Sequence, residues 1–109
     1  HTTLAGKTDM MDLVEVFSRA KVVISPDSGS AHLAWASANP AVITIFTCTP
    51  KKLLAPFGDK SKYIAVGGEG LICQPCFRRK CRRRKNKNIC MDFPCPNDVV
   101  KVVQGLKLL

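Results

Sequence analysis

The chain has 109 residues, a length that suits one domain with one hydrophobic core. No apolar run reaches the roughly 18–20 residues of a membrane-spanning helix, and no secretory signal is predicted. The formal charge is +9, yet eight basic residues and no acidic one lie between Arg78 and Lys87, and the remainder carries a net charge of only +1. This distribution argues against a fold built throughout for nucleic-acid binding. Because the chain starts at His1 rather than Met, we expect a piece of a longer protein.

Helices and strands are predicted to alternate in the first part of the chain. Thr8 is a good N-cap for a helical pattern from Asp9 to Ala20, in which apolar residues recur every three or four positions. The run from Lys21 to Ser25 predicts a buried strand. Gly29 to Ala38 predicts a second helix, stopped by Asn39-Pro40 and rich enough in alanine to lie close against a sheet.

The same alternation continues after Pro40. We expect a strand at 41–46, a short helix at 51–55, a weaker strand at 62–66 and a last helix at 96–108, with a Cys-rich basic insert at about 73–95. Strands that alternate with helices predict an α/β domain, Rossmann-like, with helices packed on a parallel sheet. Because three strands make a thin parallel sheet, the pattern indicates part of a larger domain.

The junction between the first strand and the second helix gathers polar residues in the stretch 25–34. A helix N-terminus has unpaired N–H groups and a partial positive charge that suit a phosphate, and ligands bind α/β proteins at the carboxyl ends of strands. Asp27 has two interpretations, a cap for the helix or an acceptor for sugar hydroxyls. Ser28, Gly29 and Ser30 are expected at the helix entrance. His32 is expected in the first turn, in its neutral form, where it can donate to a phosphate or sugar oxygen.

Cysteines cluster in the insert: of the six, at positions 48, 73, 76, 81, 90 and 95, five fall within 23 residues. Cys73, Cys76, Cys81 and Cys90 are the candidate ligands of a structural zinc ion, since tetrahedral zinc takes four thiolates and a Cys-x2-Cys pair supplies two of them. Free thiols and disulfides are the alternatives.

The basic run from Arg78 to Lys87 has three interpretations. It is a solvated loop, a surface for anionic lipid phosphates, or a nucleic-acid site. Nucleic acid is the less favoured partner, because Phe77 is the only aromatic residue near the run before Phe93, which leaves little for bases to stack on.

The motif Asp27-Ser28-Gly29-Ser30-Ala31-His32-Leu33 follows the first predicted strand. It resembles the Asp-Ser/Thr-Gly-Pro-x-His-Leu motif of the lipopolysaccharide heptosyltransferase family, glycosyltransferase family 9. The resemblance covers nearly the whole chain. The other matching stretches are Leu4 to Asp9, Ser18 to Lys21, Phe46 with Thr49, Pro56-Phe57-Gly58, Cys73 to Phe77, Cys81 and Cys90-Met91. The chain departs from the family at Ser30, at Thr47-Cys48 and at Pro50-Lys51, which leaves the donor's identity open.

The resemblance implies the C-terminal half of a GT-B enzyme, the nucleotide-sugar-binding domain that spans residues 1–109 here. It implies that Asp27 binds heptose hydroxyls, that Ser28, Gly29 and His32 surround the donor diphosphate, and that Thr8 lies near the base. The implied reaction transfers heptose from ADP-heptose to the lipopolysaccharide inner core, in the cytoplasm or at the inner membrane. The general base is expected in an N-terminal domain, without which the fragment is inactive, and the chemistry needs no metal. The alternative is a nucleic-acid-binding module that uses the Cys/Arg-rich loop.

Overall fold

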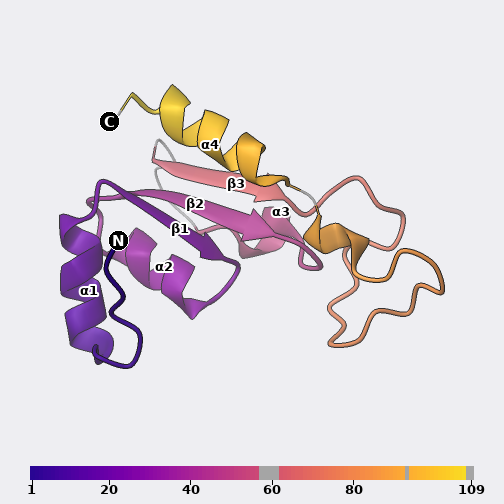
Figure 1. The fold of residues 1–109 in the computed structure, drawn as a ribbon, viewed down its shortest axis with the longest axis horizontal. Coiled ribbons are helices and arrows are strands. Elements are labelled where there is room, and N and C mark those ends of the chain that lie inside the picture. The colour runs from indigo at the N-terminus through magenta and orange to yellow at the C-terminus, as the bar shows by residue number, and fades with distance from the viewer. Residues whose placement is uncertain (57–61, 93, 108–109) are drawn as a thin grey trace.

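The computed structural model describes residues 1–56, 62–92 and 94–107, and these form a small α/β domain around a parallel sheet (Figure 1). Three strands pair in the order β1-β2-β3, namely Val22–Pro26, Ala41–Phe46 and Tyr63–Gly67. The helices are α1 (Met10–Arg19), α2 (Gly29–Ala36), α3 (Lys51–Leu54) and α4 (Pro96–Gly105), and a 3-10 turn, η1, spans Ile89–Met91. The predicted order of elements and the parallel sheet are confirmed.

The core lies between the sheet and α2. In the parallel register Val23 lies beside Val42, and Val42 beside Tyr63, so these three side chains share one face of the sheet. Ala34 of α2 is fully buried against them, which confirms that the alanines let this helix lie close to the strands. The central strand β2 is buried along almost its whole length, as expected for a parallel strand covered on both faces.

The start of α1 differs from the prediction, because Asp9 is the N-cap and Thr8 is not. The Asp12 amide donates to the Asp9 carboxylate at 2.8 Å, and the Asp9 amide donates to the Asp12 carboxylate at 3.0 Å. This reciprocal pair satisfies two amides that the first turn leaves unpaired, so the helix begins one residue later than predicted.

Strand β2 and the starts of α2, α3 and α4 lie where they are predicted, and the remaining boundaries shift by one to three residues. Helix α2 ends at Ala36 rather than Ala38, because Ala38 has left-handed backbone geometry (φ +66°) and its amide bonds back to the Trp35 carbonyl. Helix α4 ends at Gly105, and the predicted end at Leu108 lies outside the described residues. The expected stop at Pro56-Phe57-Gly58 lies partly outside them as well.

After β3 the chain leaves the sheet and extends past the strand ends, at the right of Figure 1. We call residues 71–92 the projecting segment; apart from η1 it contains no helix or strand. It is attached to the turn after β2, since the Cys76 and Phe77 amides both donate to the Cys48 carbonyl, at 3.0 and 3.2 Å. The Gln74 side-chain amide also donates to the Thr47 carbonyl, at 2.5 Å.

Candidate functional site

The turn between β1 and α2 lies at the carboxyl end of the sheet, where Figure 1 shows the arrowheads of β1 and β2 ending on the same side. Pro26 is in register with Ile45, and the Asp27 amide donates to the Ile45 carbonyl at 3.1 Å. Asp27 therefore leaves β1 directly beside the end of β2. This edge of a parallel sheet is where α/β proteins bind ligands.

Asp27 does not cap α2. The N-cap residue is Ser28, whose side chain makes no capping hydrogen bond. One oxygen of the half-buried Asp27 carboxylate instead accepts a hydrogen bond from the Thr49 hydroxyl, at 2.5 Å. The capping interpretation of Asp27 is therefore wrong, because the helix begins at Gly29, two residues after it, and the carboxylate faces the turn that follows β2.

Three serine hydroxyls lie close together in the turn that contains Asp27. Ser28 and Ser30 are 2.7 Å apart, Ser25 and Ser30 3.0 Å, and Ser25 and Ser28 3.4 Å, measured between the hydroxyl oxygens. Ser25 and Ser28 are each also within hydrogen-bonding distance of the Pro26 carbonyl. Because Ser25 is buried, its hydroxyl contacts with Ser28 and Ser30 help fix the shape of the turn.

The amino end of α2 is open on the side of Gly29. A Cβ built on Gly29 meets nothing within 4 Å, so a ligand can approach the backbone closely there. His32 is exposed and lies in the first turn of the same helix. Together with uncapped N–H groups, these features give the turn the properties of an anion site.

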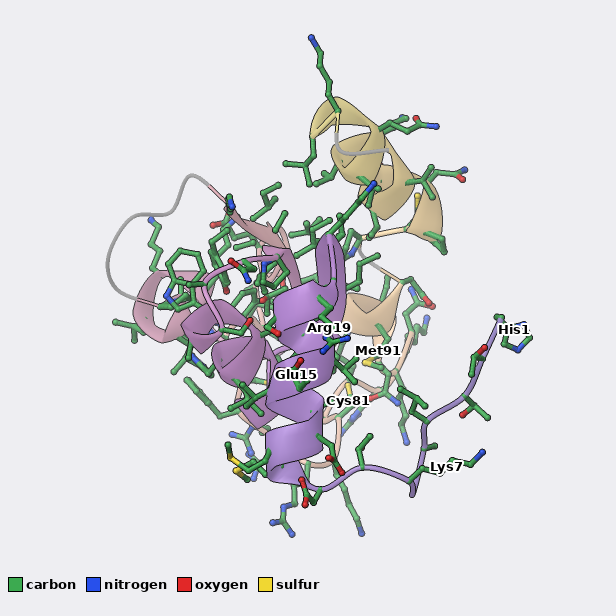
Figure 2. The ribbon with its side chains drawn as sticks, turned by 90° about the vertical axis from the view of Figure 1, so that its left-hand side faces the viewer. His1, Lys7, Glu15, Arg19, Cys81 and Met91 are labelled. Carbon is green, nitrogen blue, oxygen red and sulfur yellow. The ribbon has the colours of Figure 1, made fainter. Side chains whose placement is uncertain are left out.

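Thr8 lies in the segment before α1, and its neighbours bond within that segment. The Lys7 amide donates to the Leu4 carbonyl at 2.9 Å, and Figure 2 draws Lys7 outside α1, pointing away from the body of the domain. The placement of Thr8 near a nucleotide base stays a prediction.

The pairing of Thr49 with Asp27 was not predicted, nor were the hydrogen bonds of Ser25 and Ser30. A signal for Thr49 was available: Asp27 and Thr49 each follow a strand, and neighbouring parallel strands end at the same edge of a sheet. Ser30 is expected at the helix entrance, but its hydrogen bonding with Ser25 and Ser28 is not, although its spacing from Ser28 puts both hydroxyls in one turn.

A cavity of about 620 Å³ lies between the projecting segment and the turn after β2. It is lined by Cys73, Cys76, Cys81 and Cys90, the four predicted zinc ligands, and also by Cys48, which the prediction left out. All six cysteines are free thiols, and in the part of the chain that is described no three His, Cys, Asp or Glu side chains are arranged to hold a metal ion. Zinc binding therefore stays a prediction, one that requires the thiols to turn toward one another.

The cysteines of this cavity differ in their ionisation. The backbone N–H groups of Asn88 and Arg83, followed by the charges of Arg83 and Lys87, lower the pKa of Cys81 below its usual value. Burial raises the pKa of Cys90, and the nearby Cys48, Cys76 and Cys81 add to this effect. Cys81 and Met91, both labelled in Figure 2, line the cavity.

Comparisons with known proteins bear on this turn and on the segment after it. A model of the glycosyltransferase family 9 (heptosyltransferase) matches residues 1–87, which include the whole sheet, the turn and most of the projecting segment.

The lipopolysaccharide core heptosyltransferase OpsX of Haemophilus influenzae is 34% identical over 65 residues, which cover 60% of this chain and 18% of that protein. The chain thus spans less than a fifth of the length of that relative. No solved structure matched the chain. No helix in the described residues is long and apolar enough to cross a membrane. Because the family model matches most of its length, the chain belongs to glycosyltransferase family 9.

Proposed function

We propose that this chain is the donor-binding domain of a heptosyltransferase that transfers heptose from ADP-heptose to the lipopolysaccharide inner core. The observation that carries the proposal is the turn 25–32, where a carboxylate, serine hydroxyls and an open helix N-terminus meet at the carboxyl edge of the sheet. Family membership and the name of the Haemophilus relative support the choice of reaction.

In this proposal Asp27 accepts hydrogen bonds from heptose hydroxyls. The bond from Thr49 holds one carboxylate oxygen in place, so the other is oriented for the sugar. A carboxylate held in this way loses little side-chain freedom when the donor binds. The half-buried position of Asp27 strengthens its hydrogen bonds relative to those of a fully solvated carboxylate.

The donor diphosphate is proposed to lie over the amino end of α2. Ser28 and Gly29 contribute backbone N–H groups and a hydroxyl, and His32 reaches the same end from the first turn. N–H groups directed at the leaving diphosphate stabilise the charge that develops on it, and the helix dipole has the matching sign. Thr8 is proposed to lie near the base.

The general base is proposed to come from an N-terminal domain of the same GT-B enzyme, facing this one across a cleft. The 109-residue chain alone then holds the donor without transferring sugar, because the base and the acceptor are not positioned. The nucleotide-sugar donor suits a reaction in the cytoplasm.

The test is a titration of the chain with ADP-heptose and with ADP, followed by amide chemical shifts. ADP should shift the amides of Ser28, Gly29 and His32. Asp27→Asn should weaken ADP-heptose binding by roughly 10- to 100-fold, as expected when a charged hydrogen-bond acceptor becomes neutral, and should change ADP binding much less. Asp92→Asn is the matched control, since Asp92 is an exposed carboxylate at the end of η1.

Two results would contradict the proposal. An equal loss of ADP and ADP-heptose affinity in Asp27→Asn would remove the sugar-binding role of Asp27. Shifts from a short RNA that are confined to residues 76–88 and strongly salt-dependent, with none from ADP in the turn, would favour the nucleic-acid alternative.

A further inference from the structure

The projecting segment carries a concentration of positive charge that the domain itself does not neutralise. Of the eight basic residues from Arg78 to Lys87, all but the half-buried Arg83 are exposed. The two ion pairs among the described residues, Arg19–Glu15 and Lys51–Glu69, lie elsewhere. Such a surface attracts a polyanion.

The same segment exposes large apolar side chains. Ile72 is fully exposed, Phe77 is 61% exposed and Met91 is 68% exposed. Phe77 has left-handed backbone geometry (φ +52°), which is unusual for a bulky residue, and its amide is bonded to the Cys48 carbonyl. The turn after β2 therefore helps fix a conformation in which this ring is left in solvent.

The polyanion can be a nucleic acid or an anionic lipid bilayer, and the apolar side chains exposed beside the basic ones distinguish the two. Bases of a nucleic acid stack on aromatic rings, and among the described residues 71–92 only Phe77 is aromatic. Aliphatic and thioether side chains such as Ile72 and Met91 suit the acyl boundary of a bilayer, while Arg and Lys bind lipid phosphates.

We propose that the projecting segment is a membrane-docking surface that binds an anionic phospholipid bilayer. Its basic side chains lie among the headgroups, and Ile72, Phe77 and Met91 enter the boundary with the acyl chains. The proposal goes beyond the proposed function and does not depend on which donor is bound.

The position of the projecting segment determines where a docked bilayer lies relative to the turn 25–32. The segment extends past the carboxyl ends of the strands in Figure 1 and is bonded to Thr47 and Cys48. Thr49, one residue later, bonds to Asp27. A bilayer bound to the segment therefore lies on the same side of the sheet as the candidate site.

Vesicle sedimentation tests the proposal on the whole chain. We expect binding to phosphatidylcholine vesicles that contain phosphatidylglycerol, little binding to phosphatidylcholine alone, and a loss of binding as salt rises. Arg82→Gln with Arg84→Gln and Lys85→Gln should weaken binding on the order of 100-fold at low salt, given about 1 kcal/mol for each charge. Ile72→Ser should weaken it by roughly tenfold.

The control is Leu53→Ser, because Leu53 is 74% exposed on α3 and outside the segment. It should leave vesicle binding unchanged. Ile72 is fully exposed, so its substitution should not disturb folding, and an unchanged circular dichroism spectrum checks this. Equal binding to neutral and anionic vesicles, equal losses in Ile72→Ser and Leu53→Ser, or binding to a short RNA in preference to vesicles would each overturn the proposal.

Discussion

The sheet and the projecting segment are held by different forces. In the sheet, β2 is buried along nearly its whole length, and Val42, Ile43 and Phe46 have no exposed surface. In the projecting segment most side chains are exposed, and hydrogen bonds to Thr47 and Cys48 attach it to the body. Burial of apolar surface dominates the free energy of folding, so the sheet determines stability. The segment is then free to expose charged and apolar side chains.

The largest expected effect on stability comes from truncating one phenylalanine side chain in each region. Phe46→Ala should lower the free energy of unfolding by about 3–5 kcal/mol, because it leaves a cavity in the fully buried end of β2. Phe77→Ala should change it by less than about 0.5 kcal/mol, because the ring is mostly exposed. Urea unfolding of the two variants measures the difference. Equal losses would mean that the projecting segment belongs to the cooperative core.

A smaller effect is expected where the two regions join, at Gly68 and Gly70. Both have positive φ, +75° and +104°. A Cβ on Gly68 would approach the Cβ of Phe46 to 2.8 Å and the Thr49 carbonyl to 3.3 Å, whereas a Cβ on Gly70 meets nothing within 4 Å. Gly68→Ala should therefore cost about 2–4 kcal/mol of stability, from backbone strain and overpacking together.

Gly70→Ala is the matched control, with backbone strain alone and a cost of about 1–2 kcal/mol. Both values come from urea unfolding. If the two substitutions cost the same, contact with Phe46 does not constrain the start of the segment.

The contrast between the regions also explains which predictions succeeded. Alternation of apolar runs with helical patterns was enough for the order of elements and the parallel sheet, because burial imposes those patterns on sequence. The error at Thr8 arose because Asp9 and Asp12 cap α1 together, and a reciprocal pair is not evident from the preference of one residue. Of the two interpretations of Asp27, the helix cap is wrong for a similar reason, since its partner Thr49 is 22 positions away.

The projecting segment was harder to predict because no burial pattern organises it. Spacing within 73–90 suggested four cysteines for one site, yet the cavity is also lined by Cys48, which the backbone bonds of Cys76 and Phe77 bring to the segment. Such contacts depend on how a loop folds back on the body, and local spacing carries no information about that. The zinc prediction is tested by the metal content of the purified chain, with about one equivalent expected for four thiolates.

The smallest expected effect distinguishes two thiols within the projecting segment. The pKa of Cys81 is lowered and that of Cys90 is raised, and alkylation requires the thiolate. As pH rises, Cys81 should therefore become reactive first, and at about pH 7 it should be alkylated faster than Cys90 in metal-free protein. Mass spectrometry of peptides after timed iodoacetamide treatment measures both rates. Urea-unfolded chain is the control, and there the two rates should converge because the backbone N–H bonds to Cys81 and the burial of Cys90 are lost. Equal rates in the folded chain would show that the segment does not hold the Asn88 and Arg83 amides against Cys81. The projecting segment would then behave as an ordinary solvated loop, without a fixed cavity.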